Sequence, residues 1–260
     1  MRRSIATLLI PAVGLTLVAQ TIFLLNGWNV MPAKVLELVL LLGGATLLAG
    51  GRSEGRRLFA GLVRWRIGIG VLLIVVAALP LLTVVVAVVT GSLQSVDGGW
   101  VQVVMTYLLF LVFGAITANL WEETVWAGFV QTRLMARHGL LIGSLLTAVP
   151  FFIIHLPLAF ETNGWAGTSW SDALATWGIL LVSAPFFRYL IGMVLIDTGG
   201  SLLAAGLLHA SFNASGALPV LSGGWQYVPA MILLTVAVAV LRRRHRRSTA
   251  QATEVTARAV

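Results

Sequence analysis

The chain has 260 residues, of which 58% are hydrophobic and only 10% are charged, and its mean hydropathy is +0.96. A soluble domain carries about 25% charged residues, so this chain has too few to cover a water-facing surface. The composition argues against a disordered chain and a soluble enzyme fold, and it predicts an all-α, polytopic transmembrane bundle. The chain has no cysteine, which excludes disulfides, thiolate metal ligands and a cysteine nucleophile.

Apolar runs long enough to cross a bilayer recur from end to end, and we expect eight spans of about 20 residues each. They are Ile5–Leu25, Met31–Ala49, Ile67–Thr90, Val101 into the 120s, Leu140–Phe160, Ala173–Ile196, Ser201–Leu218 and Tyr227–Leu241. Arg2 and Arg3 give the first span the look of a signal peptide. It is longer than a signal-peptide core and no small-residue cleavage site follows it, so we expect a retained helix. The β-branched runs lie inside spans of helical length, so we expect no strands.

The arginines predict the orientation of these spans. With the N-terminus inside, 15 of the 16 arginines fall on the inner side, and the predicted outer loops from 161 to 172 and from 216 to 224 contain no Lys or Arg. The inner arginines are Arg2, Arg3, Arg52, Arg56, Arg57, Arg64, Arg66, Arg133, Arg137, Arg242, Arg243, Arg244, Arg246, Arg247 and Arg258. This asymmetry follows the positive-inside rule, so we expect both termini in the cytoplasm and the protein in the plasma membrane. The formal charge of +8 then meets anionic lipid headgroups, and we expect no nucleic-acid partner.

We expect three regions along the chain. Residues 1–100 hold the first three spans without a motif, residues 101–224 hold a catalytic core of four spans, and residues 225–260 hold the last span and a basic cytoplasmic tail.

Ionisable residues inside an apolar span are costly, so each one calls for an explanation. Glu122, Glu123, His155, Arg188 and His209 lie well inside the predicted spans. At 1.5 Å per residue, Glu122, Arg188 and His209 lie about 13 to 16 Å from the inner edge, whereas His155 lies deeper unless its helix tilts. A carboxylate pair and two imidazoles are therefore expected to share one polar pocket.

The spacings within the spans favour the same pocket. His209 and Asn213 are four residues apart and share a helix face, as do Asn119 and Glu123. Taken singly, a membrane His or Asn is more often a packing residue that bonds a neighbouring helix. Together they supply a general base and hydrogen-bond donors.

Lys34 and Glu37 stand apart from this group, near the outer end of the second span. They are three residues apart on one face, which favours a local ion pair with both side chains reaching the interface.

Three ordered motifs resemble the CAAX-protease and bacteriocin-processing (CPBP, or Abi) family of intramembrane proteases. They are Glu122-Glu123 followed by Gly128, Phe151-x-x-x-His155 and His209-x-x-x-Asn213, and they span roughly residues 119–216. The resemblance implies a glutamate-dependent peptidase that cuts a hydrophobic or membrane-anchored peptide or protein. It implies that Glu122 is the general base, that His155 polarises the attacking water, and that His209 and Asn213 stabilise the oxyanion.

The chain departs from the family at one position. The usual first motif is E-E-x-x-x-R, and the expected arginine is replaced by Ala127. Three arrangements are open. Arg188 supplies the missing charge to Glu123 from another helix, Glu123 is neutral and bonded to Asn119 or to backbone, or Arg188 reaches the inner interface and serves another role.

Three functions therefore remain open. The first is an intramembrane endopeptidase; the second is a catalytically silent relative acting as a scaffold or immunity factor, which Ala127 favours. The third is a proton-coupled transporter with a Glu–His–His relay, although no inverted repeat supports it. The resemblance implies no cofactor, while Glu122, His155 and His209 leave a zinc site possible by residue type.

Overall fold

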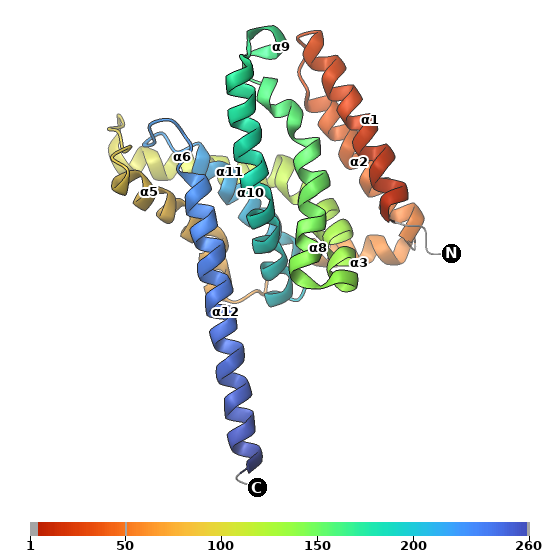
Figure 1. The fold of residues 1–260 in the computed structure, drawn as a ribbon, viewed down its shortest axis with the longest axis vertical. Coiled ribbons are helices and arrows are strands. Elements are labelled where there is room, and N and C mark those ends of the chain that lie inside the picture. The colour runs from red at the N-terminus through yellow and green to blue at the C-terminus, as the bar shows by residue number, and fades with distance from the viewer. Residues whose placement is uncertain (1–4, 50, 259–260) are drawn as a thin grey trace.

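The structure, a computed structural model, is a bundle of helices (Figure 1). It describes residues 5–49 and 51–258, without the side chains of Met31, 45–49 and 246–258. Arg2 and Arg3 lie outside the described residues, and so do the side chains of Arg246, Arg247 and Arg258, so these five basic groups have no structural account.

The described residues form helices and contain no named strand, which confirms the all-α prediction. The helices of the first half are α1 (Ile5–Leu25), α2 (Met31–Ala49), α3 (Arg52–Leu62), α4 (Ile69–Leu73), the π-helix η1 (Ile74–Ala78), α5 (Leu79–Val89), α6 (Gly99–Gly114), the π-helix η2 (Ala115–Asn119), α7 (Leu120–Val125) and the π-helix η3 (Trp126–Gln131). Those of the second half are α8 (Thr132–Ile154), the 3₁₀-helix η4 (Leu156–Phe160), α9 (Gly164–Gly167), α10 (Trp170–Asp197), α11 (Leu202–Gly216) and α12 (Tyr227–Arg258).

Several helices pack around α11. α1 lies against α2 at one side of the bundle, α8 against α10 in the middle, and α12 against both α10 and α5 (Figure 1). α11 contacts α6, α7 and α10, so it is placed to bring residues of several helices together. In Figure 1 the short helix α9 lies at one end of the bundle and α3 lies toward the opposite end, beyond which α12 extends.

Four stretches of the described chain are long and apolar enough to cross a membrane: Ile5–Leu25, Ile69–Val89, Gly99–Phe160 and Trp170–Asp197. These stretches, together with the composition, make the chain an integral membrane protein. The prediction of eight spans and of cytoplasmic termini stays a prediction.

The stretch Gly99–Phe160 is not a single straight helix. Gly139 has φ 77° and ψ 173°, a backbone conformation that a glycine adopts without strain. The chain turns there, and Gly143 then lies so close to the backbone of Met135 that a Cβ on it would be 2.5 Å from the Met135 Cα. This turn separates the expected fourth and fifth spans. The helix of the fifth ends at Ile154 rather than at Phe160, since His155 caps it and Pro157 lies in a 3₁₀ turn.

Two π-helices flank α7, the short helix that carries Glu122 and Glu123. A π-helix inserts a residue into the helical register and therefore rotates the side chains that follow it. The third π-helix, η1, meets Tyr107 of α6, whose hydroxyl donates a hydrogen bond to the Val76 carbonyl and bonds Ser211 Oγ at 2.9 Å. The π-helices thus decide which side chains of these spans point toward α11.

The last helix is longer than expected. α12 continues past Leu241 to Arg258, and Arg242 Nη1 bonds Asp197 Oδ2 at 2.9 Å and the Met193 carbonyl at 2.7 Å. These bonds fasten α12 to the end of α10.

Candidate active site

The site begins with a close approach of α7 and α11. Gly206 of α11 lies against Leu120 of α7, and a Cβ on Gly206 would be 2.9 Å from the Leu120 Cα. Because Gly206 has no side chain, the two helix backbones come close together. Three residues further along each helix, His209 Nδ1 reaches Glu123 Oε1 at 2.8 Å.

Glu123 is completely buried and is held by a guanidinium from a third helix. Arg188 Nη1 lies 2.8 Å from Glu123 Oε2 and Arg188 Nη2 lies 2.9 Å from Glu123 Oε1, a two-pronged ion pair between buried side chains. Arg188 of α10 therefore supplies the cation that Ala127 cannot. Asn119 does not bond Glu123: its Oδ1 is buried without a partner among the described residues.

The buried guanidinium is also fixed by rings and by its own backbone. Arg188 Cζ lies 3.7 Å from the centre of the Phe151 ring and 5.3 Å from that of Phe187. Gln131 Nε2 donates to the Arg188 carbonyl at 2.6 Å and to Ser144 Oγ at 3.1 Å. Sequence reasoning missed Gln131 as a support of the site, although a buried amide in a membrane span is a signal that it bonds a neighbouring helix.

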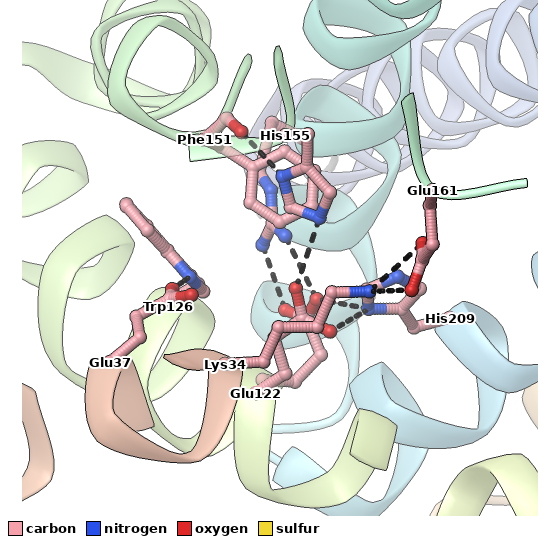
Figure 2. Close-up of polar contacts among 10 residues, drawn as sticks. Lys34, Glu37, Glu122, Trp126, Phe151, His155, Glu161 and His209 are labelled. Atoms are coloured by element: carbon pink, nitrogen blue, oxygen red, sulfur yellow. Dashed lines mark hydrogen bonds and ion pairs between the residues drawn. The ribbon is translucent and has the colours of Figure 1, made fainter. Parts of the chain in front are cut away.

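The second carboxylate, Glu122, faces His155. His155 Nε2 lies 3.4 Å from Glu122 Oε1, and His155 Nδ1 lies 2.6 Å from the Phe151 carbonyl (Figure 2). A carbonyl only accepts hydrogen bonds, so Nδ1 carries the proton and a neutral His155 presents a lone pair at Nε2. His209 also approaches Glu122, with its Nδ1 3.9 Å from Glu122 Oε2.

The hydrogen bonds define where one further proton can reside. His209 Nδ1 faces an ion-paired carboxylate and therefore donates to it, so its Nε2 carries a proton only in the imidazolium form. Glu123 and Arg188 cancel in charge. One proton on Glu122, on His155 Nε2 or on His209 Nε2 then makes the cluster neutral, and moving it among them is acid–base chemistry.

These groups open into one cavity of about 340 Å³. Its wall includes Glu122, His155, His209 and Asn213, which the sequence analysis had singled out, and apolar side chains such as Phe152 and Leu180. Asn213 is exposed and lies one turn beyond His209. The structure therefore brings Glu122, His155, His209 and Asn213 to one cavity, whereas Glu123, which was also expected there, is buried behind the wall and paired with Arg188.

The expected ion pair between Lys34 and Glu37 is wrong. Lys34 Nζ bonds Glu161 Oε1 at 3.0 Å and Oε2 at 3.2 Å, joining α2 to the connection after η4. Glu37 instead points inward and accepts a hydrogen bond from Trp126 Nε1 at 3.0 Å (Figure 2). The physical reason is that the buried indole N–H needs an acceptor, and Glu37 is the carboxylate within reach.

The described part of the chain contains no group of three or more His, Cys, Asp or Glu side chains with the spacing of a metal site. Both Nδ1 atoms already serve in hydrogen bonds to protein oxygens, so of Glu122, His155 and His209 only the Glu122 carboxylate and the two Nε2 atoms are left to bind a metal.

Residues 103–215 match the family model described as Rce1-like, type II CAAX prenyl endopeptidase Rce1-like. No curated protein was found to match the chain. The matched segment runs from α6 to α11 and includes all three motifs, so it confirms the resemblance that the motifs indicated. Residues 103–215 are thus similar to the Rce1-like model, which belongs to the CPBP family of membrane proteases.

Proposed function

We propose that the protein is an intramembrane endopeptidase of the plasma membrane that hydrolyses a peptide bond in a hydrophobic or membrane-anchored peptide or protein. The Rce1-like match supports a membrane endopeptidase in general. The observation that carries the specific proposal is that Glu122 and His155 Nε2 face each other at 3.4 Å on the wall of a cavity that also holds His209 and Asn213. The surrounding lipid is the protein's other partner, and the proposal includes no nucleic acid.

In the first step, Glu122 and His155 bind and orient the attacking water. Both present acceptors, a carboxylate oxygen and the Nε2 lone pair, so the water donates one hydrogen to each and directs its own lone pair at the substrate carbonyl. The water oxygen bonds the carbonyl carbon as one proton passes to Glu122.

In the second step, the negative oxygen of the tetrahedral intermediate needs donors. The imidazolium form of His209 donates from Nε2 and Asn213 donates from its amide, both from one face of α11. When the carbon–nitrogen bond breaks, Glu122 returns the proton to the departing amine, which yields a carboxyl terminus and an amino terminus.

Glu123 and Arg188 act as positioning residues in this mechanism. Glu123 accepts a hydrogen bond from the Nδ1–H of His209 and so orients the Nε2 of that ring toward the substrate, while Arg188 keeps Glu123 ionised. Ala127 had favoured a catalytically silent relative because it leaves Glu123 without its usual cation. The Arg188 ion pair removes that argument and so supports the active enzyme.

The experiment is proteolysis of a hydrophobic reporter peptide by the purified protein in liposomes. We expect Glu122→Gln to lower kcat by roughly 100-fold or more, the usual contribution of a general base. Asp172→Asn removes an exposed carboxylate at the start of α10 and should leave kcat unchanged.

The same assay separates the competing functions. Full activity of Glu122→Gln contradicts the assigned base, and loss of wild-type activity with a chelator indicates metal chemistry. A wild-type protein that cuts no peptide, yet carries protons across the liposome membrane in a Glu122-dependent way, supports the transporter.

A further inference from the structure

A third carboxylate lies on the wall of the catalytic cavity and takes no part in the proposed mechanism. Glu37 comes from α2, outside the segment that matches the family model. Its side chain is only 6% exposed, and it lines the same cavity as Glu122 and His155. The proposed hydrolysis mechanism does not require a carboxylate at the position of Glu37.

The hydrogen bonds of Glu37 leave it short of donors. Glu123 receives three hydrogen bonds, two from Arg188 and one from His209. Across the described residues, Trp126 Nε1 is the one donor bonded to Glu37. A carboxylate has about four acceptor positions, and a buried polar group is normally paired, so the remaining oxygen facing the cavity indicates a donor that a bound molecule brings.

The charges around the cavity point to a cation. Arg188 is cancelled by Glu123, and Lys34, which lines the cavity, is cancelled by Glu161. Among the described cavity-lining residues this leaves Glu37 and Glu122 as the carboxylates without a Lys or Arg partner. A buried carboxylate in this position favours a cationic ligand with N–H donors.

The position of Glu37 indicates a subsite beside the reacting groups. Figure 2 shows the Glu37–Trp126 pair to one side of the cluster formed by Glu122, His155 and His209. Trp126 lies one turn after Glu122 on the same helical stretch, and its ring packs edge-on against Phe151 at 5.6 Å. Glu37 thus lines the same cavity as the acid–base cluster without being part of that cluster.

We propose that Glu37 forms an acidic subsite of the cavity that binds a lysine or arginine side chain of the substrate, next to the peptide bond that is cut. The inference rests on the proposed peptidase function and adds to it a preference for one class of substrate. The ammonium or guanidinium donates to the oxygen of Glu37 that Trp126 leaves free.

The test is binding, so that it does not depend on cleavage. Labelled hydrophobic peptides with one lysine are compared with twins that carry norleucine at the same position, the lysine being moved along the peptide from one pair to the next. We expect the wild-type protein in nanodiscs to bind one lysine peptide about tenfold more tightly than its twin, the order of a charge-assisted hydrogen bond. Glu37→Gln keeps an acceptor for Trp126 and should bind both peptides equally, and Asp172→Asn should keep the preference.

The outcomes distinguish this inference from the proposed function. Equal affinity for every pair in the wild-type protein, including no binding to either member, overturns the subsite, as does a preference that persists in Glu37→Gln. Cleavage without a lysine preference leaves the peptidase in place and removes the subsite. A Glu37-dependent preference without any cleavage supports the subsite and contradicts the peptidase. An unchanged unfolding temperature of Glu37→Gln shows that the fold is intact.

Discussion

At position 127 an alanine stands where the first motif has arginine, and the cation comes instead from Arg188 on α10. We expect Arg188→Ala to lower the free energy of unfolding by about 3–5 kcal/mol, because it leaves the buried Glu123 without a countercharge. Position 127 follows Glu123 by four residues, so Ala127→Arg on the Arg188→Ala background should restore part of that loss. Chemical denaturation in detergent measures both effects.

Arg188→Lys serves as the control, because it keeps the charge but loses the two-pronged geometry, and we expect an intermediate loss. A double variant no more stable than Arg188→Ala would show that an arginine at 127 cannot reach Glu123 from η3.

Tyr107 illustrates how a single hydroxyl supports an irregular helix. It donates to the Val76 carbonyl within η1, and we expect Tyr107→Phe to lower the unfolding free energy by roughly 1–3 kcal/mol, since a buried carbonyl is left with a weaker partner. Tyr189→Phe is the matched control, because no hydrogen bond of the Tyr189 hydroxyl occurs in the described part of the chain. Equal losses in the two variants would contradict the role of Tyr107.

At the scale of elements, α3 is fastened to the catalytic segment by charges. Glu54 bonds Arg57 within α3 and Arg133 Nη1 at 3.1 Å across to α8, and Arg57 Nη2 bonds the Gly128 carbonyl at 2.7 Å. Burial raises the pKa of Glu54, but the hydrogen bonds and charges of Arg57 and Arg133 outweigh it and hold the pKa below the ordinary 4.5.

Because the pKa of Glu54 is lower in the folded protein than in the unfolded chain, its contribution to stability is complete above pH 4.5 and is lost as the pH falls through the folded value. We expect the amide protons of α3 to lose protection from exchange over that acid range. Glu54→Gln should be less protected at neutral pH and should change less on acidification. Equal acid sensitivity in both proteins would contradict the role of Glu54.

The helices also show which structural features the hydrophobic pattern of the sequence can predict. Hydrophobic run length predicted the bounds of α1, α2, α10 and α11 to within a few residues, but it missed the extension of α12 to Arg258. The i, i+4 spacing placed His209 and Asn213 on one face. The hydrophobic pattern could not predict η2 and η3 on either side of α7, because a π-helix arises from packing and leaves that pattern intact. The spacing of residues also predicted Lys34 as the partner of Glu37, which is wrong. Spacing within α2 cannot reveal that the indole of Trp126, on another helix, lies beside Glu37.

At the scale of the whole molecule, orientation is the open prediction. Cysteines introduced at Ser169, exposed at the start of α10, and at Ser248, in the extension of α12, report on opposite ends of the bundle. In a chain without cysteine, we expect an impermeant maleimide added outside intact cells to label position 169 alone. Labelling of both positions from outside would refute cytoplasmic termini, and labelling of both in opened cells is the control.

The sequence by itself determined that this is a helical membrane protein and which ionisable residues stand in its apolar spans, because the cost of a charge in lipid makes those residues conspicuous. Three ordered motifs then indicated the family. Only the tertiary structure decided the partners: Arg188 with Glu123, Lys34 with Glu161, and Glu37 with Trp126. Which side chains of different helices pair with each other depends on how closely the helices approach and on how each helix is rotated about its axis. Here the close contact at Gly206 and the π-helices set both, and neither can be read from the spacing of residues along one helix.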